Sequence, residues 1–226
     1  MAGFFVTGTD TEVGKTYVTV QLIRSLVANG YRTVGMKPIA SGGLSGQDGR
    51  PVNEDVLQHA NAANVAAPLE WRNPYAFSDP VSPHLAAARA NTHVQFSVVS
   101  QAYQHLAALA EVVLVEGAGG WLAPVSENQT MSDLAIALNL PVILVVGVRL
   151  GCLNHAMLTV ESILARNVPL AGWVANCIDP VMPCQDENVA YLSSAIAAPR
   201  LGTLHWNEQV EGAETVFDTE RLKLLF

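Results

Sequence analysis

A lysine and a threonine at the start of a helical pattern are the residues best suited to chemistry. Lys15 and Thr16 follow Gly14 in the stretch FFVTGTDTEVGKT, residues 4–16, which opens on a short apolar strand pattern. Backbone N–H groups can converge there on an anion, while the lysine adds charge and the hydroxyl reaches a magnesium ion. The stretch therefore predicts a phosphate-binding loop, although five residues instead of the usual four separate Gly8 from Gly14.

A second lysine, Lys37, ends another apolar pattern and is followed by Pro38 and a Ser-Gly-Gly turn. Lys15 is expected to contact the β- and γ-phosphates of a nucleotide. Two lysines near one triphosphate are more than nucleotide binding needs. We therefore expect Lys37 to stabilise a developing anion on an acceptor or on the transferred phosphoryl group.

Two carboxylates are candidate metal ligands. Glu116 follows the apolar run 112–115, and Asp55 lies in the first turn of a predicted helix. Oxygen atoms are the ligands that Mg²⁺ prefers, so Thr16, Asp55 and Glu116 are expected to hold this ion. The histidines show no metal-ligand spacing, and His59 is expected to be a surface or packing residue.

Composition narrows the class of protein. Of 226 residues, 50% are hydrophobic and 14% are charged, which is typical of a compact globular enzyme. The net charge of −8, without a basic cluster, argues against a nucleic-acid partner. Three cysteines without paired spacing indicate neither a disulfide framework nor a zinc site. No leader or membrane-spanning pattern is found, so a cytoplasmic location is expected.

Strand patterns alternate with helical patterns along the chain. We expect strands at 4–7, 33–39, 112–115, 141–146, 170–175 and 200–204. Helices are expected at 16–28, 53–61, 84–90, 96–110, 132–138, 153–166, 187–197 and 219–225. Residues 40–51 and 73–83 are rich in Gly, Ser or Pro and are expected to be irregular.

Several strand patterns are continuously apolar, as in strands that helices cover on both faces. The order predicts a single doubly wound α/β domain over residues 1–226, with a mostly parallel sheet. Ligands of such sheets bind beyond the carboxyl ends of the strands. Polar groups follow four of the strands here: residues 7–16, Lys37, Glu116 and Asn176.

These residues resemble the dethiobiotin synthetase family, whose motifs follow in family order up to about residue 204. The motifs are VTGTDTEVGKT (6–16), KPIASG (37–42), NPY (73–75), SPH (82–84), VEGAGGW (115–121), PVILVVG (141–147), GCLNHA (151–156) and GWVAN (172–176). The five-residue spacing within the phosphate loop is the normal form in this family.

The resemblance implies a P-loop NTPase fold and an ATP- and Mg²⁺-dependent cyclo-ligase of biotin synthesis. Such an enzyme converts 7,8-diaminononanoate, CO₂ and ATP into dethiobiotin, ADP and phosphate. One amine forms a carbamate, the carbamate takes the γ-phosphoryl group, and the neighbouring amine closes a cyclic urea. Family members are homodimers, with the carboxylate tail of the diamine near the subunit interface.

The resemblance also assigns residues. Catalytic positions match Thr11, Glu12, Lys15 and Lys37. Nucleotide contacts match Glu12, Val13, Gly14, Lys15, Thr16, Tyr17, Glu116, Gly117, Ala118, Gly119, Asn176 and Cys177, with Asn176 reading the adenine. Diamine contacts match Ser41, Gly151, Cys152, Leu153, Asn154 and, across an alignment gap, Tyr191. Cys177 and His205 depart from the family pattern, and both positions bear on base recognition.

Three alternatives stay open at this point. A partition- or positioning-type P-loop ATPase has the same architecture, but its second lysine normally lies within the loop and Lys37 would have no role. An amidating enzyme related to cobyrinate synthesis normally needs a glutaminase domain, for which this chain is too short. The third alternative is a paralogue that keeps the fold but acts on another diamine.

Overall fold

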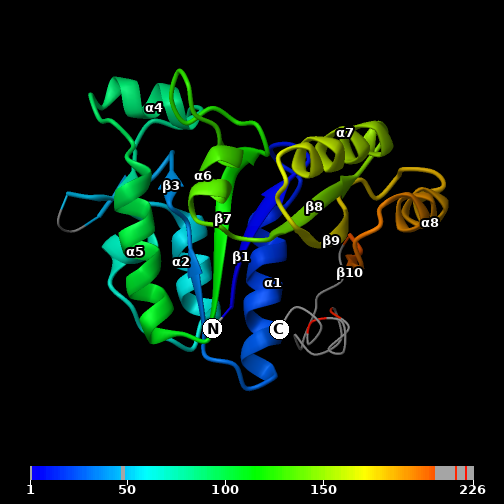
Figure 1. Cartoon of the computed structure of the whole chain (residues 1–226), viewed down its shortest axis with the longest axis horizontal. Coiled ribbons are helices and arrows are strands. Elements are labelled where there is room, and N and C mark those ends of the chain that lie inside the picture. Colours follow the sequence, from blue (N-terminus) through cyan, green and yellow to red (C-terminus); the bar gives the residue numbers. More distant parts are fainter. Residues whose placement is uncertain (1, 47–48, 207–216, 218–221, 223–226) are drawn as a thin grey trace.

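The computed structural model describes residues 2–46, 49–206, 217 and 222 (Figure 1). At its centre lies a six-stranded sheet in the order β10-β9-β8-β1-β7-β2. Every neighbouring pair in this sheet is parallel, as the alternating strand and helix patterns predicted. The strands are β1 (Ala2–Gly8), β2 (Thr33–Met36), β7 (Val112–Gly120), β8 (Val142–Val148), β9 (Leu170–Cys177) and β10 (Arg200–Leu204).

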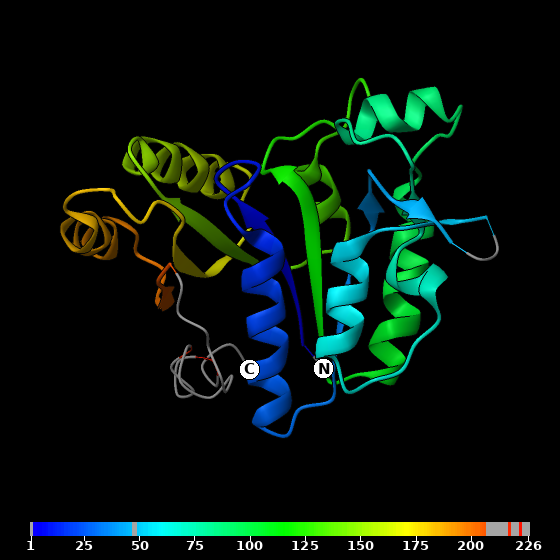
Figure 2. The same ribbon diagram turned by 180° about the vertical axis from the view of Figure 1, so that it is seen from behind.

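Helices cover both faces of the sheet. Figure 1 looks onto the face covered by α5 (Phe96–Leu109), α6 (Met131–Ala137) and α7 (Cys152–Ala165), with α8 (Gln185–Ala195) at the side. Figure 2 shows α1 (Lys15–Ala28) and α2 (Glu54–Ala62) on the opposite face. Side chains of β1 alternate between the two cores: Phe4 and Val6 pack with α1, and Phe5 packs with α5. The doubly wound prediction is therefore confirmed.

The strand predicted at 33–39 is in fact two strands. β2 ends at Met36, and β3 (Ile39–Ala40) pairs instead with β6 (Tyr75–Ala76) in a separate small sheet. Pro38 has no backbone N–H to continue the ladder. The backbone of Lys37 is bound elsewhere, since its carbonyl accepts a hydrogen bond from Asn73 Nδ2 at 2.6 Å. Because of this break, Lys37 directly follows the carboxyl end of β2, next to β7.

Two regions expected to be irregular contain short elements. Residues 40–51 include a hairpin of β4 (Leu44–Ser45) and β5 (Pro51–Val52), and β6 lies within 73–83. The single-turn helix α3 (Leu69–Arg72) was not predicted, and α4 (Pro83–Arg89) matches the pattern at 84–90. The helix predicted at 219–225 lies outside the described residues except for Leu222. Among the residues described, no helix combines the length and apolar character needed to span a bilayer.

Candidate functional site

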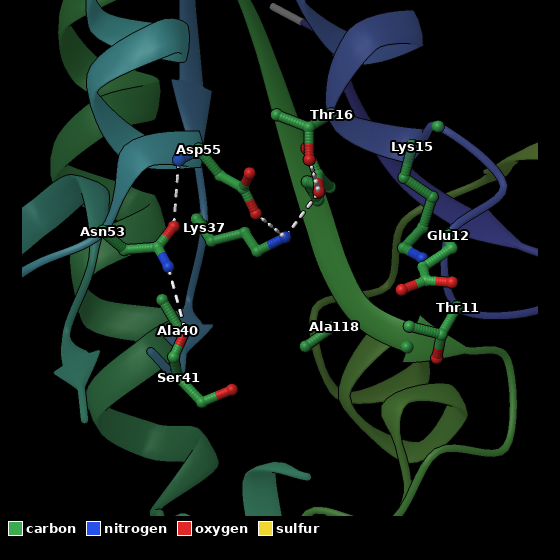
Figure 3. A pocket seen from close by; sticks show the side chains of 13 residues that line it. Thr11, Glu12, Lys15, Thr16, Lys37, Ala40, Ser41, Asn53, Asp55 and Ala118 are labelled. Atoms are coloured by element: carbon green, nitrogen blue, oxygen red, sulfur yellow. Dashed lines mark hydrogen bonds and ion pairs between the residues drawn. The ribbon is translucent and has the colours of Figure 1, made fainter. Parts of the chain in front are cut away.

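A cavity of roughly 270 Å³ lies at the carboxyl ends of β1, β7 and β2 (Figure 3). Its walls come from the phosphate loop (residues 8–16), the end of β7, the segment after β2 and the start of α2. In Figure 3, Lys37 and Asp55 lie on one side of the cavity, and Lys15, Glu12 and Thr11 on the other. The lining residues are Thr11, Glu12, Gly14, Lys15, Thr16, Lys37, Ala40, Ser41, Asn53, Asp55, Glu116, Ala118 and Gly119.

Backbone conformation shapes the phosphate loop. Gly14 caps α1 in the left-handed region at φ 77°, and a Cβ there would overlap Nδ2 of Asn176. That amide nitrogen donates a hydrogen bond to the Val13 carbonyl at 2.9 Å, which ties the loop to the end of β9. Glu12 also has a positive φ of 58°, a conformation that costs energy for a residue with a side chain. The loop is thus held in a strained form at the N-terminus of α1, where an anion is favoured.

Lys15 lies almost completely buried over the phosphate loop. Its Nζ atom donates to the backbone carbonyl of Asp10 at 3.1 Å. Burial, and next the charge of Lys37, lower the pKa of Lys15 from 10.5 to about 8. A triphosphate in the cavity would offset both effects, because it supplies negative charge to this ammonium.

Glu116 is the centre of the polar network, and its side chain is fully buried. Oε1 accepts hydrogen bonds from Thr16 Oγ1 at 2.9 Å and from Lys37 Nζ at 2.5 Å. Lys37 Nζ also lies 2.8 Å from Asp55 Oδ2. Burial alone would raise the pKa of Glu116, but the Lys37 ammonium and then His59 outweigh it and hold that pKa well below its usual range.

The neighbouring carboxylates in turn keep Lys37 charged. Burial alone would lower the pKa of Lys37, but the carboxylates of Glu116 and Asp55 raise it above the ordinary value. The site thus holds a permanent cation beside a second lysine whose pKa is depressed.

His59, which was expected to be a surface or packing residue, contacts the polar network. It is buried, not on the surface, and its Nε2 atom lies 2.8 Å from Oε2 of Glu116. The available signal was its spacing from Asp55, because residues four apart share one face of a helix. His59 and Asp55 both face the buried network from α2: Asp55 contacts Lys37, and His59 contacts Glu116, which lies within β7.

The donor set fits a hard divalent cation. Thr16, Asp55 and Glu116 contribute a hydroxyl and two carboxylates, and Mg²⁺ is commonly bound by one or two carboxylates together with substrate phosphates. Within the described ranges no group of three or more His, Cys, Asp or Glu side chains is arranged to hold a metal ion, so protein groups alone do not form a closed cage. Lys37 lies between the two carboxylates and would share them with the ion.

A second cavity, of roughly 520 Å³, shares Glu12 and Gly14 with the first. Its remaining lining residues are Tyr17, Asn176, Cys177, Ile178, His205 and Trp206. The Trp206 side chain is about half exposed, at 53%, whereas Cys177 is buried. A planar base could stack on an aromatic wall of this kind. Cys177 and His205, the two positions that depart from the family pattern, both line this predicted base site.

Not every predicted residue faces these cavities. Ser41 lines the first one, and its carbonyl accepts a hydrogen bond from Asn53 Nδ2 at 3.0 Å. Gly151 caps α7, which begins with Cys152, Leu153 and Asn154; Tyr191 lies on α8 and is exposed. These five residues do not line either cavity of this chain. Gly117 and Val13 likewise support the site without lining the first cavity.

Solved structures of two cell division proteins have similar folds. The chain superposes on the MinC:MinD cell division protein complex of Aquifex aeolicus with a TM-score of 0.56 and 13% identity, covering 95% of this chain and 85% of that one. The cell division protein FtsY of Thermotoga maritima gives a TM-score of 0.53 and 15% identity, covering 99% and 67%. At 13–15% identity, these likenesses show the fold and no more.

Sequence relatives are much closer. A family model described as an AAA domain matches residues 2–214. The ATP-dependent dethiobiotin synthetase BioD of Ralstonia nicotianae is 48% identical over 200 residues, covering 88% of this chain and 87% of that protein. The BioD of Nitrosospira multiformis is 44% identical over 222 residues, covering 97% and 96%. With this identity over nearly its whole length, the chain belongs to the ATP-dependent dethiobiotin synthetase family.

Proposed function

We propose that the protein uses ATP to carboxylate 7,8-diaminononanoate and to close the product into the cyclic urea dethiobiotin. One observation carries the proposal: Lys37, outside the phosphate loop, donates to the same Glu116 oxygen as Thr16 within it. A second buried cation beside a phosphate loop suits an enzyme that must stabilise an acceptor anion. Relatives at 44–48% identity carry the name of this activity.

The reaction needs an anionic acceptor and a phosphoryl donor side by side. One amine attacks CO₂, an N–C bond forms, and the nitrogen loses a proton to leave a carbamate. The carbamate oxygen attacks the γ-phosphorus, and the bond to ADP breaks. The second amine attacks the carbonyl carbon of the resulting anhydride and expels phosphate, which closes the ring.

The residues of the site suit these steps. The phosphate loop and Lys15 would bind the triphosphate, and Lys37 would stabilise negative charge on the carbamate and on the phosphoryl group. Removal of one such preorganised donor typically costs a hundredfold to a thousandfold in kcat. Thr11 and Glu12 lie across the cavity from Lys37, which supports contacts with the phosphates and the substrate.

The proposal includes Mg²⁺, held by Thr16, Asp55 and Glu116. When bound, this ion would neutralise charge on the β- and γ-phosphates. Asn176 would read the adenine, within the cavity that Tyr17, Cys177 and Trp206 also line.

We also propose a cytoplasmic homodimer. The predicted diamine contacts at the start of α7 and at Tyr191 do not line the cavities of one chain. A second subunit beside α7 would give them a role at the diamine tail, together with Ser41 from within the cavity. The net charge of −8 supports the absence of a nucleic-acid partner.

ADP release tests the function against the switch-ATPase alternative. The proposed enzyme should release ADP only when both the diamine and bicarbonate are present. ADP release that continues at the same rate without the diamine would favour an ATPase switch and contradict the proposal.

A further inference from the structure

Helix α2 presents two side chains to the buried network around Glu116, and only one of them was expected there. Asp55 contacts Lys37, and His59, one turn later, contacts Glu116. The His59 side chain is 1% exposed. Burial of an imidazole and a carboxylate costs free energy unless the two groups form a hydrogen bond with each other.

The hydrogen-bond roles follow from the chemistry of the carboxylate. Glu116 is ionised and can only accept, so His59 Nε2 must carry the proton that joins it to Oε2. The other ring nitrogen, Nδ1, is buried and has no hydrogen-bond partner among the residues that the structure describes. The hydrogen bond from Nε2 to Glu116 is therefore the polar interaction that orients the imidazole ring.

Packing leaves the ring little freedom. Gly35 of β2 lies directly beneath it, and a Cβ at position 35 would lie 2.7 Å from His59 Cβ and 3.0 Å from Cγ. The absence of a side chain at Gly35 thus allows α2 to approach β2 closely enough for the imidazole to reach Glu116.

We propose that His59 is a positioning residue for the metal and nucleotide site. Its Nε2–H holds Oε2 of Glu116, which fixes the carboxylate so that Oε1 faces Thr16 and Lys37. The assignment rests on the proposed function, since it takes Glu116 to be a metal ligand. Groups that orient a ligand in this way typically contribute tenfold to a hundredfold to metal affinity.

Glu116 would otherwise have a free oxygen in a buried place. Without His59, Oε2 would lose a charge-assisted hydrogen bond where water cannot replace it. The carboxylate could then rotate to share Lys37 and Thr16 between its two oxygens. Oε1 would no longer be held in the direction that a metal ion between the loop and β7 requires.

Two amide substitutions separate positioning from packing. In His59→Gln, the side-chain Nε2 can take the place of the imidazole Nε2 and donate to Glu116. In His59→Asn, the shorter side chain places its amide nitrogen only where Nδ1 lies, so it cannot donate to Glu116. Both variants are uncharged and polar, so a purely structural role predicts similar behaviour.

The measurement is ADP affinity by calorimetry across a Mg²⁺ titration, which requires no turnover. We expect the Mg²⁺ concentration that gives half of the affinity gain to rise about tenfold to a hundredfold in His59→Asn. In His59→Gln it should stay within about threefold of the unaltered protein. Melting temperatures should fall by similar amounts in the two variants.

The failures are distinguishable. If the unaltered protein shows no effect of Mg²⁺ on ADP affinity, the metal site and the role of His59 are both overturned. If it shows the effect and His59→Asn shows it at the same Mg²⁺ concentrations, the positioning role alone is overturned. If His59→Asn does not fold, His59→Gln still tests the proposal. A tenfold or larger rise in the Mg²⁺ concentration that His59→Gln needs would overturn the positioning role.

Discussion

Lys37 and Glu116 form a buried ion pair, with Nζ 2.5 Å from Oε1. Lys37 follows β2 and Glu116 lies within β7, and these strands are neighbours in the sheet. The same Glu116 oxygen accepts from Thr16, so the pair connects the second lysine directly to the phosphate loop. Lys37 therefore lies on the same side of the sheet as the loop, as an anion-stabilising role requires.

The first prediction concerns this lysine. Lys37→Ala should lower kcat by a hundredfold or more, about 3 kcal/mol of transition-state stabilisation. ADP affinity should stay within about fivefold, because Lys15 and the loop amides remain. Dethiobiotin formation and calorimetry measure the two effects. Near-normal turnover would remove Lys37 from the chemistry.

Lys15→Ala is the matched variant, because it removes the other lysine of the same cavity. It should lose ATP affinity by at least tenfold, about 1.4 kcal/mol, since it removes a charge from the phosphates themselves. Unchanged ATP binding in this variant would contradict the assignment of the phosphate loop.

The second prediction follows from the depressed pKa of Lys15. In the nucleotide-free protein this pKa is about 8, against 10.5 for an ordinary lysine. Between these values the unfolded chain retains a proton that the folded protein has lost, so stability should rise with pH. The slope is at most about 1.4 kcal/mol per pH unit for one group.

Denaturant unfolding from pH 7.5 to 10 tests this slope. Lys15→Met removes the titrating group, so the free energy of unfolding of the unaltered protein should rise with pH relative to that of this variant. A difference that stays constant across this range would show that Lys15 has an ordinary pKa.

The third prediction compares two glycines with similar backbone conformations. Gly14 and Gly30 have φ values of 77° and 87°, but only a Cβ at position 14 would overlap another group, Asn176. Either alanine variant should lose about 1–2 kcal/mol of stability from left-handed strain. Only Gly14→Ala should also weaken ADP binding, by tenfold or more. Equal ADP affinity in both variants would show that the contact does not shape the loop.

The fourth prediction addresses base choice. Asn176 donates to the Val13 carbonyl, which leaves its side-chain oxygen available to the base. Asn176→Ala should reduce the ratio of kcat/KM for ATP over GTP by at least tenfold. Trp206→Ala should instead weaken both nucleotides alike, because stacking tolerates any base. An unchanged ratio in Asn176→Ala would assign base reading to other groups.

Much of this arrangement could be predicted from sequence because it depends on short-range patterns. Continuous apolar runs identified the parallel strands, and the rule that ligands lie beyond strand ends brought Lys37, Glu116 and the phosphate loop to one edge. The order of the strands in space was not predicted. It is set by crossover packing, which sequence periodicity does not encode.

The errors have physical causes as well. The pattern at 33–39 runs across Pro38, and composition does not show that the chain leaves the sheet there to form β3. The contact between His59 and Glu116 was not predicted, because the two residues are far apart in sequence and only the fold brings them together. The residues at the start of α7 remain predictions, since one chain does not bring them to the cavity.

The most direct test of the central claim is the mass of the product. The protein should be incubated with 7,8-diaminononanoate, ¹³C-bicarbonate and MgATP, and the products separated and weighed by mass spectrometry. We predict dethiobiotin with the label in its ureido carbon, formed in equal amount with ADP. ADP formation without any labelled ureido product would contradict the account.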